Sequence, residues 1–71
     1  MYTKREALIK KRGNLTQEAV AKELDTTQKN LSKIEKGLGN PSIKLLAKMC
    51  MFYKSKPEEL FPDIFLDSNT T

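Results

Sequence analysis

The chain has 71 residues, with 13 Lys and Arg against 9 Asp and Glu, a net charge of +4, no histidine and a single cysteine, Cys50. A chain of this length forms one domain that buries only about 60% of its unfolded surface, and with one cysteine it can build neither an internal disulfide nor a Cys-based metal cage. We therefore expect no enzyme, no metal and no cofactor. We also expect no membrane partner, because the apolar runs are far shorter than the roughly 20 residues of a spanning helix.

A first helix is predicted over Thr3–Arg12. Ala7 and Leu8 can face inward, and the basic residues 10–12 suit the negative end of the helix dipole. Gly13 and Asn14 end this helix.

Residues 16–36 are typical of two short helices joined by a tight turn. Thr16 can cap the first, in which Val20, Ala21 and Leu24 form a narrow apolar stripe. The turn contains Asp25 and Thr26, and a second helix is predicted over Thr27–Lys36. Its Leu31 and Ile34 lie three residues apart and are expected in the core, so its polar side chains point elsewhere. This is the layout of a helix-turn-helix whose second helix enters the DNA major groove.

Two further helices are predicted after the Gly- and Asn-containing loop that ends at Pro41. Ser42 can cap a helix reaching about Tyr53, with an apolar stripe made of Ile43, Leu46, Met49, Cys50 and Tyr53. Cys50 is expected to pack in this stripe. Ser55 and Glu58 have the spacing of a capping box, which favours a short fifth helix through Leu60.

The elements indicate a compact all-α domain of four to five helices over residues 1–66, followed by a disordered tail over residues 67–71. Ile64, Phe65 and Leu66 either pack on the body of the protein, pair with a second copy, or stay exposed.

Charge is unevenly distributed along the chain. Residues 1–56 carry +8 and residues 57–71 carry −4. A basic body suits a polyanionic partner, and an acidic tail would face away from it, although simple solubility is the alternative reading.

Residues from about Leu8 to Leu60 resemble the XRE-like family of helix-turn-helix proteins, which includes the phage repressors and Cro. The positions that carry the resemblance are Gln17, Ala21, Leu31, Ile34, Glu35 and Gly37, with the Asn-Pro-Ser segment at residues 40–42. The resemblance implies a lambda-repressor-like DNA-binding fold. The chain departs from the family at Asp25 and Lys54, where glycine is common, and at Lys10, where the family often has an arginine. We expect Lys10 to pair with Glu35 inside the structure.

Base reading is predicted near the front of the helix that begins at Thr27. The Gln28 amide can hold adenine through N6 and N7 together, and the Thr27 methyl can contact thymine. Lys29 and Lys33 could donate to guanine or reach phosphate, and Ser32, like Asn30, is a weaker candidate.

Phosphate binding is predicted at two helix starts, where backbone N–H groups point at anions. Thr16 and Gln17 form one site, as the resemblance also implies. Asn40 and Ser42 form the other, with Lys36 and Lys44 supplying charge or simply remaining solvated.

Together these features predict a sequence-specific regulator that binds double-stranded DNA. We expect a small repressor, acting as a homodimer by operator occupancy and having no small-molecule ligand. We expect it to be cytoplasmic, encoded by a bacterium or phage and associated with the nucleoid. The alternative is an antitoxin-like or adaptor module of the same fold, which binds a partner protein and contacts DNA secondarily.

Overall fold

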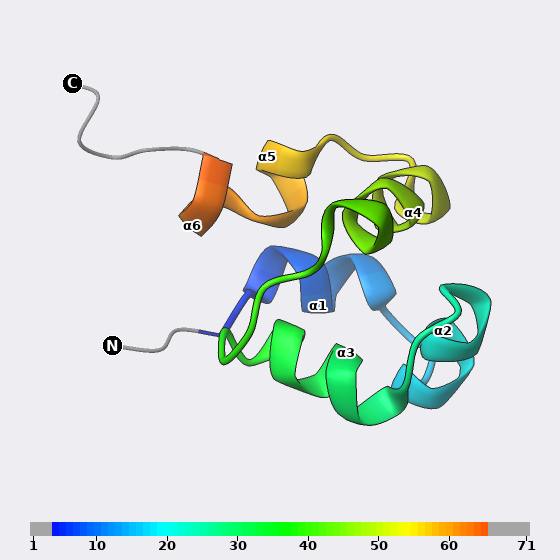
Figure 1. The fold of residues 1–71 in the computed structure, drawn as a ribbon. Helices are drawn as coiled ribbons and strands as arrows, with labels where there is room; N and C mark the ends of the chain where they lie inside the picture. Colours follow the sequence, from blue (N-terminus) through cyan, green and yellow to red (C-terminus); the bar gives the residue numbers. More distant parts are fainter. Residues whose placement is uncertain (1–3, 66–71) are drawn as a thin grey trace, which may run out of the picture.

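Six helices make up the secondary structure of residues 4–65, the part of the chain that the computed structural model describes. They are α1 (Glu6–Arg12), α2 (Gln17–Glu23), α3 (Gln28–Glu35), α4 (Ile43–Tyr53), α5 (Pro57–Leu60) and α6 (Pro62–Phe65). Figure 1 shows α2 and α3 at one end of the molecule, α4, α5 and α6 at the other, and α1 between them. The predicted all-α fold is confirmed, and α6 adds one helix to the four to five that were expected. No helix in this part of the chain has the length and apolar character needed to cross a bilayer.

Three helices begin where the sequence places a hydroxyl-bearing residue. The side-chain oxygens of Thr16, Thr27 and Ser42 accept hydrogen bonds from backbone N–H groups three residues later, at 3.1, 3.0 and 3.1 Å. Each bond satisfies one donor that the first turn of a helix leaves without a partner. These caps fix where α2, α3 and α4 start, and the predicted caps at Thr16 and Ser42 are confirmed.

Left-handed residues end the same three helices. Asp25, Gly37 and Lys54 have φ values of 59°, 78° and 52°. After α2, the Thr26 N–H donates to the Ala21 carbonyl at 2.9 Å, and after α3 the Leu38 N–H donates to the Lys33 carbonyl at 2.9 Å. These bonds close Schellman-type ends, which turn the chain sharply. Asp25 therefore adopts the conformation for which the family uses glycine.

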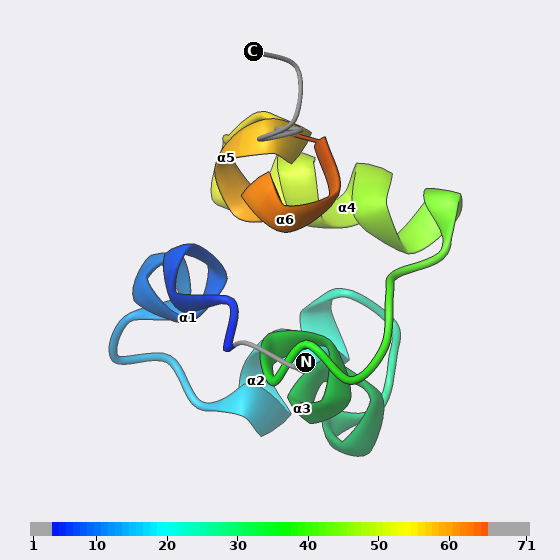
Figure 2. The same ribbon diagram turned by 90° about the vertical axis from the view of Figure 1, so that its left-hand side faces the viewer.

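The core joins α1 to the other helices. α2 and α3 pack side by side, while α1 contacts α3 and α5 (Figure 2). The buried apolar residues are Leu8, Val20, Ala21, Leu24, Leu31, Ile34, Leu45, Met49, Leu60 and Phe61. The predicted core positions of the helix-turn-helix, Val20, Ala21, Leu24, Leu31 and Ile34, are confirmed. The inner face of α3 packs in the core, and its outer face is accessible.

The predicted apolar stripe of α4 is wrong at its first residue. Ile43 is 87% exposed, and Leu45 is buried in its place together with Met49. Residues two positions apart lie about 200° apart around a helix, so burial of Leu45 turns Ile43 outward. The prediction for Met49 is confirmed, and Cys50 packs partly buried against the core, as expected.

The cap of α5 also differs from its prediction. Ser55 is buried and its hydroxyl donates to the Tyr53 carbonyl at 3.0 Å, while the Lys56 N–H donates to Glu59 Oε1 at 2.8 Å. The helix therefore starts one residue later than the predicted Ser55–Glu58 box. The predicted first helix starts too early, because Lys4 and Arg5 are not helical and α1 begins at Glu6. Residue Thr3, the position of Leu66 and the predicted disorder of residues 67–71 lie outside the described residues.

Candidate nucleic-acid interface

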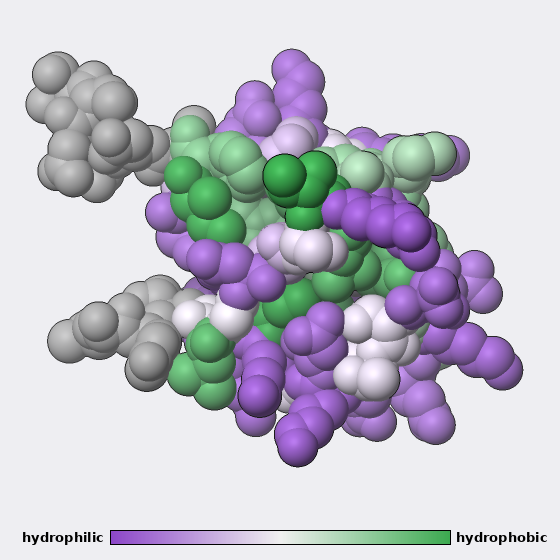
Figure 3. Space-filling model, in the orientation of Figure 1, coloured by the Kyte–Doolittle hydropathy of each residue, from purple (hydrophilic) through white to green (hydrophobic). Residues whose placement is uncertain are grey.

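The outer face of α3 is polar and accessible. Thr27, Gln28, Lys29 and Lys33 are exposed, and Ser32 is half-buried. Leu31 and Ile34, on the opposite face, are at most 1% exposed. Figure 3 shows hydrophilic residues gathered over the part of the molecule formed by α2 and α3, with more apolar surface over α4, α5 and α6. The packing of α3 thus leaves the predicted base-reading residues free.

A shallow groove of about 490 Å³ runs along this outer face, and we call it the α3 groove. It is lined by Gln17, Gln28, Lys29, Ser32, Lys33, Lys36 and Leu38. Four of the five predicted base-reading residues and two predicted phosphate-binding residues therefore share one site. Its three lysines face no acidic residue in the lining, so the groove favours a polyanion.

The hydrogen bonds at the start of α3 restrict two side chains there. The Thr27 hydroxyl oxygen is used for the cap, which leaves its methyl group free for an apolar contact. Asn30 Nδ2 donates to Thr26 Oγ1 at 2.9 Å, so this amide is tied to the turn. No such bond to Gln28 occurs among residues 4–65, and its amide keeps all of its donors and acceptors for a ligand.

Glu35 is removed from this basic surface by burial. It is 2% exposed, and its carboxylate accepts from Arg12 Nε at 2.7 Å, from Arg12 Nη2 at 3.1 Å and from Gln17 Nε2 at 2.8 Å. The hydrogen bond to Glu35 raises the pKa of Arg12 above its usual value. The predicted pairing of Lys10 with Glu35 is wrong. Lys10 is exposed because α1 directs Arg12, rather than Lys10, towards α3.

The Gln17 side chain therefore links α2 to the buried ion pair of Arg12 and Glu35. Its backbone N–H and one side-chain N–H remain available for an anion. Thr16 is exposed beside it. The Thr16 oxygen accepts the capping bond, and its hydroxyl hydrogen stays available for donation.

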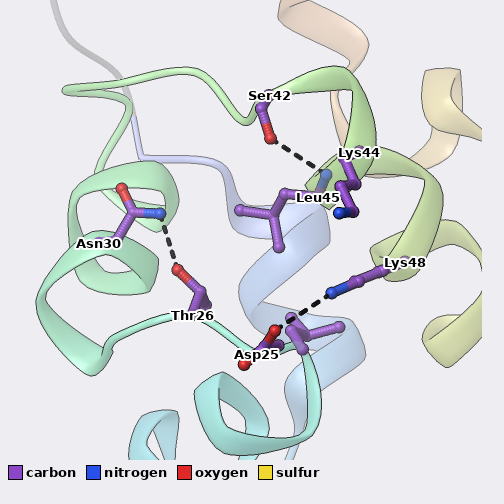
Figure 4. A pocket seen from close by; sticks show the side chains of 8 residues that line it. Asp25, Thr26, Asn30, Ser42, Lys44, Leu45 and Lys48 are labelled. Carbon is purple, nitrogen blue, oxygen red and sulfur yellow. Dashed lines mark hydrogen bonds and ion pairs between the residues drawn. The ribbon is translucent and has the colours of Figure 1, made fainter.

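A second hollow, of about 270 Å³, separates α3 from α4. It is lined by Leu24, Asp25, Thr26, Asn30, Ser42, Lys44, Leu45 and Lys48. Figure 4 shows Lys48 reaching from α4 towards the turn before α3, where its Nζ lies 3.7 Å from Asp25 Oδ2. Ser42 and Lys44 lie here, apart from the α3 groove. Lys48, which we did not single out from the sequence, adds a second cation.

Asn40 lies in the loop between α3 and α4 and is exposed. Its Oδ1 accepts from Arg5 Nη2 at 2.6 Å, so its side-chain NH2 group is the part left for a partner. Arg5 itself is 6% exposed.

Sequence reasoning missed both arginines that organise this region. Arg12 could have been found, because it lies four residues after the inward-facing Leu8 and so shares its side of α1. Arg5 carries no local signal, since its side-chain partners lie 29 to 58 residues away.

Among residues 4–65, no three Cys, Asp or Glu side chains gather closely enough to hold a metal ion.

Comparison with known proteins agrees with this geometry. A family model described as helix-turn-helix matches residues 5–60. An uncharacterized HTH-type transcriptional regulator of Methanocaldococcus jannaschii is 44% identical over 48 residues, which cover 68% of this chain and 73% of the relative. A second protein of the same description, from Archaeoglobus fulgidus, is 38% identical over 48 residues, covering 68% of each chain.

The match covers all of the elements that form the two hollows, from the start of α1 to the end of α5. It confirms the resemblance drawn from residues 8–60 and the expectation that the chain is a helix-turn-helix protein rather than an enzyme. The chain belongs to the XRE-type helix-turn-helix family.

Proposed function

We propose that the protein is a transcriptional regulator that binds double-stranded DNA sequence-specifically through α3. The observation that carries the proposal is the exposure of Gln28 at the front of a helix whose other face is locked in the core. A glutamine amide there can make paired hydrogen bonds to adenine in the major groove, worth about 1–3 kcal/mol of discrimination. The family match and the names of the two relatives support this function.

In the proposed complex, base contacts come from Thr27, Gln28, Lys29, Ser32 and Lys33. Phosphates bind on either side, at Thr16 and Gln17 around the start of α2 and at Asn40, Ser42 and Lys44 around the start of α4, with Lys36 adding charge. Both groups lie at helix starts, where N–H donors and the helix dipole favour anions. The burial of Glu35 supports this arrangement, because it leaves the lysines of the α3 groove without an opposing charge.

We further propose that the protein acts as a homodimeric repressor by occupying an operator. One recognition helix contacts about half a turn of DNA, so two copies on half-sites about 34 Å apart provide affinity and specificity. Ile64 and Phe65 on α6, which are 39% and 45% exposed, are the proposed dimer contact. Dimerisation at α6 would leave the α3 groove open, because no residue of α6 lines that groove.

Those same two residues favour a second candidate function. A partner protein could cover Ile64 and Phe65, and DNA contact would then be secondary. Sequence preference separates the candidates, because an adaptor that meets DNA only through charge binds all duplexes alike.

Selection from a random duplex library with the purified protein tests the proposal. We expect enrichment of a palindrome that contains adenine at the position read by Gln28. Binding without enrichment would favour the adaptor function, and absence of duplex binding at low ionic strength would contradict the regulator.

A further inference from the structure

Arg5 connects α6 to the loop between α3 and α4. Its Nη1 donates to the carbonyls of Ile34 and Gly39 at 2.9 and 2.6 Å. Its Nη2 donates to Asn40 Oδ1 at 2.6 Å and to Asp63 Oδ2 at 3.0 Å. The guanidinium therefore holds the end of α3, the loop and α6 at one point.

Asp63 fixes the plane of that guanidinium. Its two carboxylate oxygens accept from Arg5 Nε, each at 3.2 Å, in addition to the bond from Nη2. A carboxylate that spans two nitrogens of an arginine sets its orientation as well as its distance. The Phe61 ring, 5.1 Å from the guanidinium carbon, lies against the same group. With one edge fixed by Asp63, the remaining N–H groups point at Ile34, Gly39 and Asn40.

This orientation determines how Asn40 is presented. Arg5 has only donors, so the Asn40 oxygen must face it and the Asn40 NH2 group must face away. An outward NH2 group is what a phosphate contact requires. We propose that Asp63 is a positioning residue for DNA binding, which acts through Arg5 to hold Asn40 in its phosphate-binding orientation.

The inference rests on the proposed function. It predicts that loss of the Asp63 carboxylate changes DNA affinity in the direction opposite to that expected from charge alone. Asp63 belongs to the acidic segment 57–71, and removal of an acid from a DNA-binding protein ordinarily strengthens binding. We expect Asp63→Ala to weaken it instead. The matched control is Glu58→Gln, which removes a negative charge from the same segment without touching Arg5.

The experiment measures duplex affinity by fluorescence anisotropy with a fluorescein-labelled mixed-sequence duplex, at several salt concentrations. We expect Asp63→Ala to weaken binding about fivefold, the equivalent of one hydrogen bond, and to leave the salt slope nearly unchanged, because the Asn40 amide carries no charge. Glu58→Gln should bind as tightly as the wild type or slightly more tightly. Asp63→Ala should cause no further loss of affinity in an Asn40→Ala background, because the proposed path ends at Asn40.

Two results would overturn the inference. One is an Asp63→Ala affinity equal to that of Glu58→Gln, and the other is an equal loss with and without Asn40, which would indicate general destabilisation.

A measurement without DNA separates this inference from the proposed function. In ¹⁵N-resolved NMR spectra, Asp63→Ala should shift the Asn40 side-chain amide signals, and Glu58→Gln should leave them in place. If the shift occurs while the wild type ignores duplex DNA, the regulator proposal fails although the link from Asp63 to Asn40 stands. Unshifted Asn40 signals would contradict the link itself.

Discussion

Arg12 and Glu35 form a two-point ion pair between the last turn of α1 and the last turn of α3, with Nε–Oε2 and Nη2–Oε1 distances of 2.7 and 3.1 Å. The Glu35 side chain is 2% exposed and that of Arg12 is 18% exposed. A carboxylate so deeply buried depends on its partner, because an unpaired buried charge is costly.

Arg12→Met should therefore destabilise the fold strongly. We expect a loss of about 3 kcal/mol, the low end for a broken buried pair, because Arg12 is partly exposed and Gln17 still donates to Glu35. Lys10→Met, two residues earlier on the exposed face, should change stability by less than about 0.5 kcal/mol. Urea unfolding followed by circular dichroism provides both values. Equal losses would contradict the assignment of Arg12 as the partner.

Tyr53 carries a buried hydroxyl that has no hydrogen-bond partner among residues 4–65. Desolvation, together with the nearby charge of Glu35, raises its pKa to about 12. Between pH 10 and 12 the unfolded chain releases this proton and the folded chain keeps it, so the free energy of unfolding should fall as pH rises. Tyr53→Phe should show a shallower fall over this range and should be no less stable at pH 7. A steeper fall in the variant would contradict the assigned burial.

Lys54 ends α4 in the left-handed conformation, with φ 52° and ψ 48°. A side chain costs about 1 kcal/mol there, so Lys54→Gly should stabilise the protein by up to that amount. Lys56→Gly is the control, since Lys56 has φ −82° and gains nothing from glycine's freedom. Thermal unfolding of the two variants measures the difference. Destabilisation by Lys54→Gly would show that its side chain makes a contact that outweighs the strain.

The proposed dimer contact on α6 can be tested without disturbing Asp63. The double variant Ile64→Ser with Phe65→Ser should convert a concentration-dependent sedimentation profile to that of a monomer, because it removes the exposed apolar surface of the helix. The control is Ile43→Ser with Met51→Ser, which alters exposed apolar residues on α4 instead. Loss of association in the control alone would indicate that the dimer surface lies on α4 instead.

Local signals made most of the fold predictable from the sequence. The hydroxyl residues at 16 and 42 mark helix starts because the cap bond spans three residues, and the stripe of Val20, Ala21 and Leu24 lies within two turns. Helical phase was harder to judge where apolar residues crowd together. In α4, either Ile43 or Leu45 could begin the buried face, and only packing against the other helices decides between them.

The supporting contacts of the site depended on distant parts of the chain. Arg5 contacts Asn40 and Asp63, which lie 35 and 58 residues away in the sequence, so no periodic pattern indicates these contacts. The choice of Arg12 over Lys10 follows from the direction in which α1 docks on α3. By contrast, the exposure of Gln28 and of its lysine neighbours was predictable, because they are the polar residues left on a helix whose apolar face is evident.

The most direct test of the regulator proposal is base preference with and without the Gln28 amide. Gln28→Ala should lose the preference for adenine at one position of the selected duplex, at a cost of about 1–3 kcal/mol there. Lys36→Ala should instead weaken all duplexes alike and flatten the salt slope by about one unit. Parallel selections from one random library compare the three proteins. Relaxed preference at a single base pair in Gln28→Ala alone is the result we expect, whereas an unchanged preference would contradict base reading by α3.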